Sequence, residues 1–413
     1  MYFIYNLFVQ FAWLLLQLIA LFNKKISLFV KGRKNTFAVL NKQISPKDEV
    51  IWVHVASLGE FEQGLPIIEK LKLEYPTYKI LVTFFSPSGY EVKKETKVAD
   101  AVCYLPMDTI GNAHKFLNKV NPKLAIFIKY EIWPNFLNEL QKRKTPTILV
   151  SAIFNKNQVY FKSYGGFMRK ALKRFQHIFV QDEKSSTLLR SIKINNVTIS
   201  GDTRFDRVAQ ILERDNYNET IQNFKQNQTC FVAGSSWPED EQIIVTTINS
   251  SSLPIKWIIA PHNIKLDQIE KLKNSIKKKT ALYSERNQLD TQNYDVIIID
   301  NIGLLTQIYS YADIAYVGGG FATGLHNTLE PAVFGIPVII GPNYHGFKEA
   351  EEMVKIKGIQ LISNTEGFKQ LLDEFLDKNQ YSLMKEAGAI NANYVTENKG
   401  ASIQITSYIR TLL

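Results

Sequence analysis

The sequence predicts an α/β protein made of two doubly wound parallel sheets, and three observations support this. The chain of 413 residues is long for a single hydrophobic core. Its strand-like segments are apolar throughout instead of alternating, which is typical of parallel strands covered by helices on both faces. The alternation of β and α segments begins near Glu49, is interrupted at 201–215 and then starts again, which predicts two domains.

The predicted elements alternate in both halves. In the first half, strands are predicted at 50–56, 80–86, 101–106, 124–130, 147–153, 177–182 and 197–200, with helices that include 60–75, 110–120 and 132–142. In the second half, strands are predicted at 230–236, 257–262, 296–300, 314–320, 337–342 and 359–363, with helices that include 239–249, 266–277 and 303–311. The predicted domains are 25–205 and 206–413, and the last helix is a candidate to cross back. Two such domains place a ligand cleft outside the carboxyl ends of the strands.

The N-terminal segment predicts a membrane anchor. Residues 2–22 carry no charge, and as a helix they would be roughly 30 Å long, about one hydrocarbon core. Asn6, Gln10 and Gln17 dilute this signal, so a helix lying in the interface is the alternative. No positive charge precedes the segment and no small-x-small site follows it, which argues against a cleaved signal peptide. We therefore expect residues 1–24 to form an uncleaved anchor that is separable from the catalytic body.

The charge distribution indicates an anionic partner. The formal net charge is +10, and a strongly basic protein attracts nucleic acid, membrane surfaces or phosphorylated substrates. No compact arginine-rich segment or known nucleic-acid module is present, so we expect no nucleic acid and favour the membrane surface. Several cations directly follow the anchor and predict a cytoplasmic body: Lys24, Lys25, Lys31, Arg33 and Lys34.

The cysteines and acidic residues give no sign of a metal site. Cys103 and Cys230 lie far apart in apolar segments, where buried and reduced thiols are expected. The chain has no Asp-x-Asp motif and no cysteine–histidine cluster, so we expect no metal and no other cofactor.

The most informative segment is 316–342, in which an apolar strand runs into three glycines at 318–320. Glycines at the end of a strand let backbone N–H groups approach a ligand closely. A helix is predicted to begin near Leu325 and to direct its positive end at the same place, which suits a phosphate. Asn327 and Glu330 would then lie in its first turn, within reach of a phosphate and a ribose. The alternative is a tight turn that needs glycine for its geometry alone.

Two carboxylates and one arginine follow strands of the first half. Glu60 begins a helix after the first strand and is a candidate general base. It is equally a candidate for a helix-dipole partner, with Ser57 at capping-box spacing. Glu131 follows the fourth strand, where a lone carboxylate is more often a cap than a catalyst. Arg204, within 200–206, either meets anionic groups or pairs with a neighbouring aspartate.

Small and polar residues follow strands of the second half. Ser235 and Ser236 precede a predicted helix and form a plausible phosphate cradle. His262 follows the next strand, where it either contacts a nucleotide or is structural. Residues 300–304 are placed to bracket a base through their backbone. No Gly-x-Gly-x-x-Gly follows the first strand of either half, which argues against a dehydrogenase.

Taken in this order, the motifs resemble the 3-deoxy-D-manno-octulosonic acid (Kdo) transferases, which build the inner core of lipopolysaccharide. The resemblance rests on the N-terminal segment, HVASLGEFEQ (54–63), KYEIWPN (129–135), SGDTRFD (200–206) and GGGFATGLHNTLEPAVFGIPVIIGP (318–342). It implies the GT-B glycosyltransferase fold, with two Rossmann-like domains facing a cleft. It also implies an inverting transfer of Kdo from CMP-Kdo to the lipid A precursor, lipid IVA, without a metal, at the cytoplasmic face of the inner membrane.

The resemblance also implies roles for single residues. Glu60 matches the catalytic base, and Glu131 and Arg204 match residues that stabilise the transition state. The positions matched to CMP contacts are Pro261, His262, Ile302, Gly303, Leu304, Asn327, Thr328, Leu329 and Glu330. Possible phosphate contacts are Ser235, Ser236, Gly319 and Gly320. Two alternatives are another membrane-associated GT-B enzyme that uses a UDP-sugar and a non-catalytic scaffold that keeps a nucleotide-binding fold.

Overall fold

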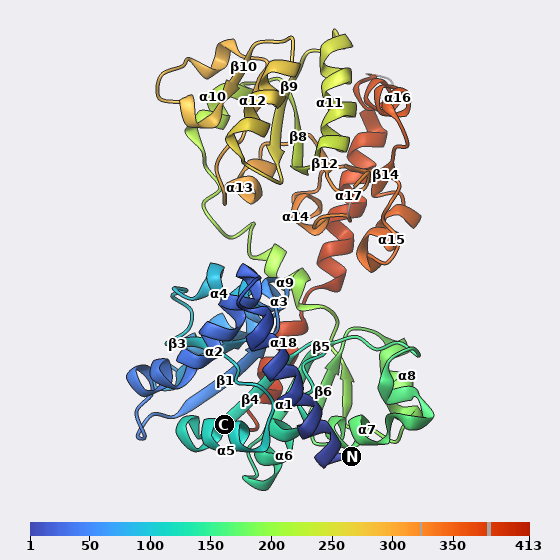
Figure 1. Ribbon diagram of the computed structural model, residues 1–413. Coiled ribbons are helices and arrows are strands. Elements are labelled where there is room, and N and C mark those ends of the chain that lie inside the picture. The colour runs from blue at the N-terminus through green and yellow to red at the C-terminus, as the bar shows by residue number, and fades with distance from the viewer. Residues whose placement is uncertain (323, 378–380) are drawn as a thin grey trace. The chain divides into compact units, whose positions relative to one another are not determined.

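The computed structural model describes residues 1–322, 324–377 and 381–413 and divides into two compact units (Figure 1). The first unit contains Met1–Arg207 and Lys399–Leu413, and the second contains Val208–Asn398. Residues 399–413, at the end of the predicted second domain, therefore pack with the first unit. Thr323, which belongs to the motif at 318–342, lies outside the described residues.

The first unit is built on a seven-stranded parallel sheet in the order β3-β2-β1-β4-β5-β6-β7. Its strands are β1 (Val50–Val55), β2 (Lys79–Phe84), β3 (Ala101–Tyr104), β4 (Leu124–Ile128), β5 (Thr147–Ala152), β6 (His177–Val180) and β7 (Val197–Ile199). Every residue of β1 and β4 is buried, as the continuous apolar segments indicate for strands covered on both faces. All seven strands predicted in this half are confirmed.

Helices cover both faces of this sheet. They are α2 (Lys24–Gln43), α3 (Leu58–Glu74), α4 (Pro87–Lys93), α5 (Ile110–Val120), α6 (Pro134–Lys142), α7 (Gly166–Leu172), α8 (Glu183–Ser191), α9 (Thr203–Ala209) and α18 (Ala401–Ile409), with 3-10 turns at Val159–Phe161 and Ser163–Gly165. Trp52, Phe116 and Phe136 belong to the core on one face. Phe61 and Ile405 belong to the core on the other, so the C-terminal helix α18 completes this unit.

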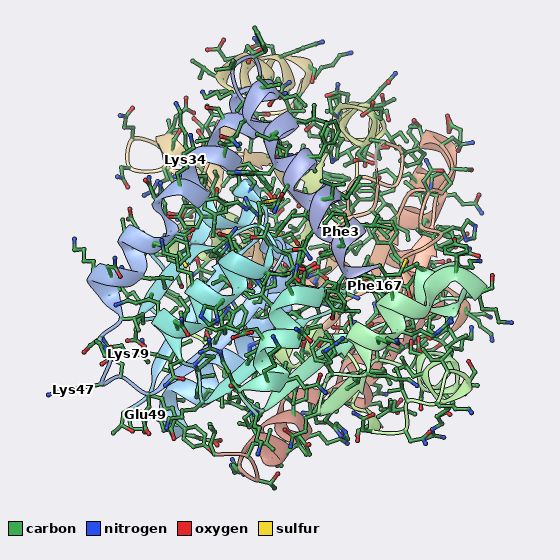
Figure 2. The ribbon with its side chains drawn as sticks, turned by 60° about the horizontal axis from the view of Figure 1, so that its bottom comes forward. Phe3, Lys34, Lys47, Glu49, Lys79 and Phe167 are labelled. Atoms are coloured by element: carbon green, nitrogen blue, oxygen red, sulfur yellow. The ribbon has the colours of Figure 1, made fainter. Side chains whose placement is uncertain are left out.

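The N-terminal helix α1 (Tyr2–Ile19) packs against the first unit (Figure 2). The Tyr5 hydroxyl donates a 2.7 Å hydrogen bond to Asp108 Oδ2, and Asn6 is buried. The ring of Tyr2 meets that of Phe167 edge to face, with 4.9 Å between centroids. The body itself therefore binds the polar residues of this helix, and whether the helix can be removed without loss of activity stays a prediction. Within the described part of the chain, α1 is the single helix long and apolar enough to cross a membrane.

The second unit repeats the architecture, with a parallel sheet in the order β10-β11-β9-β8-β12-β13-β14. Its strands are β8 (Thr229–Ser236), β9 (Ile255–Pro261), β10 (Thr280–Leu282), β11 (Val296–Ile298), β12 (Ile314–Val317), β13 (Val338–Ile340) and β14 (Ile359–Leu361). The strand β10 was not predicted, because three residues after a run of lysines carry no periodicity. The other six strands are confirmed.

The helices of the second unit surround a core that contains Phe231, Trp257 and Tyr316. They are α10 (Glu219–Lys225), α11 (Pro238–Ser250), α12 (Leu266–Ser275), α13 (Leu305–Tyr309), α14 (Leu329–Ala332), α15 (Lys348–Lys355), α16 (Thr365–Leu376) and α17 (Tyr381–Asn398), with 3-10 turns at Tyr283–Glu285 and Thr291–Asn293.

Candidate active site

The strand order of the first sheet places Glu60 and Glu131 at the carboxyl ends of two neighbouring strands. The chain runs from β1 outward to β2 and β3 and then crosses to β4, on the other side of β1. The loops after β1 and β4 therefore diverge at the carboxyl edge of the sheet, and open α/β sheets bind ligands at such a switch point. Glu60 follows β1 and Glu131 follows β4, and the two charges interact.

Glu60 is a buried carboxylate with a raised pKa. It lies in the first turn of α3, is 8% exposed, and its Oε2 accepts the N–H of Ala56. Burial and, second, the charge of Glu131 raise the pKa of Glu60 to about 7, although the bond from Ala56 and the charge of Lys129 lower it. A carboxylate with this pKa is suited to accept a proton near neutral pH. The capping box is only half formed, because the carboxylate binds Ala56 while the Glu60 N–H donates to Ser57 Oγ.

Glu131 is held by two nitrogen atoms that were not identified from the sequence. Its Oε2 lies 3.0 Å from His54 Nε2 and accepts the indole N–H of Trp133 at 2.9 Å. His54 is fully buried in β1, and its Nδ1 lies 2.8 Å from Thr83 Oγ1. These contacts fix Glu131 at the end of β4.

Trp52 belongs to the same series of hydrogen bonds. Its indole nitrogen only donates, and it lies 2.8 Å from Thr83 Oγ1. Both the hydroxyl and the backbone oxygen of Thr83 lie within hydrogen-bond distance of His54 Nδ1, at 2.8 Å and 3.1 Å, and the Trp133 indole nitrogen also lies 3.1 Å from His54 Nε2. The sequence held a signal for this series: the histidine inside the apolar strand VIWVHV, two residues after Trp52.

Arg204 is attached to the helix that carries Glu60. Its Nε donates to Asp202 Oδ2 at 2.8 Å, and Asp202 Oδ1 accepts from Gln63 on α3 at 3.2 Å. The neighbouring Thr203 hydroxyl donates to the backbone oxygen of Gln63 at 2.6 Å. The alternative of a pair with a neighbouring aspartate is therefore confirmed, and 34% of the Arg204 side chain stays exposed.

The residues predicted for the donor gather at the carboxyl edge of the second sheet. In this sheet the chain leaves β8 for β9 on one side and later crosses to β12 on the other side of β8, which creates a second switch point. The loops after β8, β9, β11 and β12 contain the predicted residues: Ser235 and Ser236, Pro261 and His262, Ile302 to Leu304, and Gly319, Gly320 and Asn327 to Glu330. The topology thus brings together segments as far apart in sequence as Ser235 and Glu330.

Close backbone packing explains the three glycines at 318–320. A Cβ atom on Gly318 would lie 2.3 Å from the backbone oxygen of Ser235, and one on Gly320 would lie 2.7 Å from the backbone nitrogen of Gly341. Gly319 has a φ of +96°, in the region that favours glycine. The geometry of the turn is therefore a sufficient reason for these glycines, as the alternative interpretation stated.

Asp240, at the start of α11, organises this glycine turn. It is fully buried, and its carboxylate accepts the N–H of Gly319 at 2.8 Å, the N–H of Trp237 at 2.9 Å and the hydroxyl of Tyr316 at 2.6 Å. Two of the four predicted phosphate donors are thus engaged within the protein, because the hydroxyl of Ser236 also donates to Glu241 at 3.0 Å. Ser235 and Gly320 remain candidates for a phosphate.

The helix after the glycine turn begins later than predicted. It was expected near Leu325, but α14 covers only Leu329–Ala332. Asn327 ends the preceding loop, because its Oδ1 accepts the N–H of Leu329 at 3.2 Å, as a side chain does when it caps a helix. Four residues build little dipole, so the expected attraction of a helix end for phosphate does not apply here.

Asn327 and Glu330 lie together at this end of the sheet. Asn327 Nδ2 donates to Glu330 Oε1 at 3.1 Å, which orients the carboxylate. Thr328 and Leu329, between them, are buried. On the loop after β11, Ile302 is 87% exposed and Gly303 has a φ of +93°.

Two other rings lie against the ring of the predicted His262. Its ring lies on Trp237 at 4.6 Å and 17°, and on His326 at 4.6 Å and 36°. The Trp237 indole donates to His326 Nε2 at 3.0 Å. Burial and, second, His262 lower the pKa of His326, which favours the neutral ring that accepts this bond. Trp237 was not predicted as a site residue, because only the fold brings it to His262.

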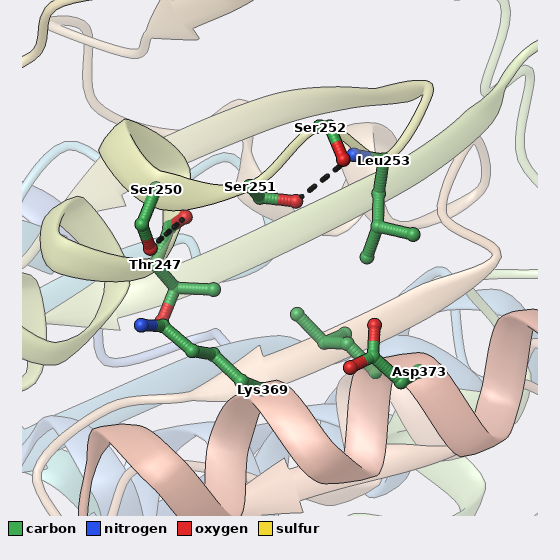
Figure 3. A pocket seen from close by; sticks show the side chains of 8 residues that line it. Thr247, Ser250, Ser251, Ser252, Leu253, Lys369 and Asp373 are labelled. Carbon is green, nitrogen blue, oxygen red and sulfur yellow. Dashed lines mark hydrogen bonds between the residues drawn. The ribbon is translucent and has the colours of Figure 1, made fainter.

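The hollows of the second unit include a small one at this edge of the sheet and a larger one away from it. One of about 20 Å³, bounded by Ser236, Glu241 and Pro261, has room for little more than one water molecule. The other, of about 220 Å³, lies between the end of α11 and α16 (Figure 3). No predicted site residue lines it, because the C-terminal end of α11 is at the opposite edge of the sheet. Across residues 1–322, 324–377 and 381–413, no three His, Cys, Asp or Glu side chains are grouped to hold a metal ion.

Comparison with known sequences identifies similar proteins. Residues 31–207 match the family model described as 3-deoxy-D-manno-octulosonic-acid transferase. A 3-deoxy-D-manno-octulosonic acid transferase of Rickettsia bellii is 27% identical over 90% of this chain and 89% of that protein. The transferase of the same name from Aquifex aeolicus is 29% identical over 87% of this chain and 97% of that protein. The similarity thus covers both units and nearly the full length of these relatives.

Solved structures share the fold. A UDP-GlcNAc 2-epimerase from Neisseria meningitidis covers 88% of this chain and 100% of its own, with a TM-score of 0.62 and 15% identity. MurG of Acinetobacter baumannii covers 88% of this chain and 99% of its own, with a TM-score of 0.56 and 9% identity. These likenesses show the GT-B fold class, with two Rossmann-like domains, as the sequence predicted.

Proposed function

We propose that this chain belongs to the 3-deoxy-D-manno-octulosonic-acid transferase family, which its similarity to these transferases supports, and that it transfers Kdo from CMP-Kdo to a sugar hydroxyl of the lipid A precursor, lipid IVA. Kdo transfer in lipopolysaccharide biosynthesis is the activity that the family indicates. One observation carries the proposal further: two interacting carboxylates flank the switch point of the first sheet, and the pKa of one is raised to about 7. A pair of this kind suits a base that acts near neutral pH.

Glu60 is the proposed base. The ionised carboxylate accepts the proton of the acceptor hydroxyl while the oxygen attacks the anomeric carbon of Kdo. The bond from that carbon to the CMP phosphate breaks on the opposite side, and the phosphate keeps the electron pair. The configuration is therefore inverted in a single displacement.

Glu131 and Arg204 are proposed to stabilise this transition state. Positive charge develops on the sugar ring and negative charge on the departing phosphate, and fixed charges that match them lower the barrier. Glu131 is suited to the first role because His54 and Trp133 hold its carboxylate in place. Arg204 is suited to the second because it is anchored through Asp202 and is still partly exposed.

The second unit is proposed to bind the CMP part of the donor without a metal. Glu330, oriented by Asn327, accepts hydrogen bonds from the ribose hydroxyls. The backbone of Ile302 to Leu304 contacts the cytosine base, and Pro261 and His262 are further proposed contacts to CMP. Ser235 and Gly320 are the remaining proposed phosphate contacts.

We further propose that the protein works at the cytoplasmic face of the inner membrane, where its lipid acceptor is found. The apolar helix α1 and the net charge of +10 support this place.

A donor screen tests the proposal against a GT-B enzyme that uses a UDP-sugar. Purified protein is incubated with lipid IVA and either CMP-Kdo or a panel of UDP-sugars, and nucleotide release is measured. We expect CMP from CMP-Kdo and no UDP from the panel. Release of UDP alone would support the alternative, and release of neither would support the non-catalytic scaffold.

A further inference from the structure

One side of α1 faces the first unit along the full length of the helix. Its buried and half-buried residues recur every three or four positions and form one stripe: Tyr2, Tyr5, Asn6, Val9, Ala12, Trp13, Leu16 and Gln17. Residues at this spacing share one face of an α-helix. This stripe of reduced exposure therefore extends from the first turn of the helix to its last.

The N-terminal end of α1 is bonded to buried groups of the body. Tyr5 donates to Asp108, and Asn6 Oδ1 accepts from Asn135 Nδ2 at 3.1 Å and from the N–H of Ile110 at 3.3 Å. Asp108 and Asn135 are 1% and 3% exposed. Breaking such contacts would leave buried polar groups without partners, which is costly. The first two turns of α1 are thus part of the fold of this unit.

The C-terminal end of α1 is attached to the same body through α2. The two helices are separated by a short turn, and Asn23 caps α2. Arg33 of α2 donates to the backbone oxygen of Phe85 at 2.8 Å, and Thr36 donates to that of Tyr104 at 2.9 Å. A helix that crosses a bilayer has its ends on opposite sides of a hydrocarbon core of about 30 Å. With its N-terminal end bonded to this unit and its C-terminal end joined to the same unit through α2, α1 does not have that freedom.

The outward face of α1 is apolar, whereas the surface that a helix exposes to water is normally polar. Its exposed residues are apolar with the single exception of Gln10: Phe3, Ile4, Leu7, Phe8, Phe11, Leu14, Leu15, Leu18 and Ile19. The polar residues Asn6 and Gln17 point inward instead. A contiguous apolar surface of this kind marks an interaction site. The exposed Lys24 and Lys25 follow directly, and the exposed Lys31 and Lys34 lie further along α2.

We infer that α1 lies in the plane of one phospholipid leaflet and attaches the protein to a single face of the membrane without crossing it. The apolar face enters the boundary between head groups and acyl chains, and the lysines that follow bind anionic head groups. This location does not depend on the proposed reaction, and the tests measure where the helix lies instead of enzymatic activity.

Cross-linking on membranes separates this arrangement from a spanning helix. The full chain with Tyr2→Cys and Phe167→Cys is bound to vesicles of phosphatidylethanolamine and phosphatidylglycerol and treated with a short bismaleimide. Cys103 and Cys230 are buried and free, so they do not compete. We expect an intramolecular link, found by peptide mass spectrometry. In the control pair, Phe22→Cys and Phe167→Cys, one cysteine lies just beyond the C-terminal end of α1. We expect no link between these two positions.

Depth measurements give the second test on the same vesicles. Nitroxides are attached one at a time to Phe3→Cys, Phe11→Cys and Leu18→Cys, and their depth is measured by electron paramagnetic resonance. A helix in the plane predicts similar depths for all three positions. A depth maximum at position 11 with shallow positions 3 and 18, together with no link between positions 2 and 167, would overturn the inference.

Discussion

The raised pKa of Glu60 links the stability of the fold to the proposed reaction. A base must be ionised to accept a proton, so we expect kcat/KM to fall as the pH drops through about 7. The same burial that tunes this carboxylate opposes its charge in the folded state. Activity and stability should therefore respond to pH in opposite directions.

Glu60→Gln should stabilise the fold above neutral pH. The folded pKa, about 7, lies above the usual 4.5, so the stability associated with the protonated form is complete below pH 4.5 and is lost as the pH rises through 7. Glutamine cannot ionise and avoids this loss, which predicts a gain of roughly 1–3 kcal/mol at pH 8. Chemical denaturation at pH 8 and pH 4 measures it. Glu69→Gln, on the same helix, is the control; an equal gain at both pH values would contradict the assignment.

His54 is predicted to act as a positioning residue for Glu131. His54→Phe removes the imidazole that lies against the carboxylate, and we expect turnover to fall by roughly 10–100-fold, the scale of losing a group that orients a functional ligand. CMP affinity should not change, because the donor residues are in the other unit. His54→Gln, which keeps an N–H donor, should recover part of the activity. Equal losses in both variants, matched by equal losses of thermal stability, would reduce His54 to a packing residue.

Glu330→Ala should weaken CMP binding if the Glu330 carboxylate accepts the ribose hydroxyls. Loss of a charged hydrogen-bond acceptor predicts an affinity lower by roughly 10-fold or more. Calorimetry with CMP measures this directly, and Glu366→Ala, in the first turn of α16, is a control. Unchanged affinity in a variant that melts like the parent would remove Glu330 from the donor site.

At the scale of elements, apolar segments and turn residues predicted most of the two sheets. Thirteen of the strands follow from segments such as VIWVHV and LAIFI, because burial on both faces leaves a signal in each segment by itself. The strand Thr280–Leu282 and the late start of α14 were missed. Both depend on neighbours distant in sequence, and Asn327 ends its loop by a hydrogen bond that local propensity does not indicate.

The side-chain networks around the site lay beyond sequence reasoning for the same reason. The positions of Glu60 and Glu131 at strand ends were predictable, but the series from Trp52 to Glu131 depends on the register of β1 with β2 and β4. Likewise, nothing local indicates that Asp240 binds the glycine turn, since Gly319 lies 79 positions away.

Asp240→Ala should therefore disrupt the glycine turn. It removes a fully buried acceptor of three hydrogen bonds and predicts a loss of roughly 3–5 kcal/mol in the free energy of unfolding, as for other broken buried networks. CMP affinity should fall with it. Glu239→Ala, the exposed neighbour on α11, is the matched control. Thermal melts and CMP calorimetry on both variants check this, and similar behaviour of the two would show that Asp240 does not organise the turn.

At the scale of the whole molecule, the two units divide the proposed work. The first contains Glu60, the proposed base, and helix α1, which we infer to lie in the membrane, so the proposed binding and deprotonation of the acceptor lipid belong to one folded unit. The second contains the predicted CMP contacts. The return of Lys399–Leu413 to the first unit connects the units twice.

Mass spectrometry of the product tests the central claim most directly. Purified full-length protein is incubated with CMP-Kdo and lipid IVA, and the lipid is analysed for wild type, Glu60→Gln and Glu69→Gln. We predict that wild type and Glu69→Gln add Kdo to the lipid, and that Glu60→Gln does so at least roughly a hundredfold more slowly, the scale of losing a general base. A lipid without added Kdo in the wild type, or a Glu60→Gln variant as fast as the wild type, would contradict the account.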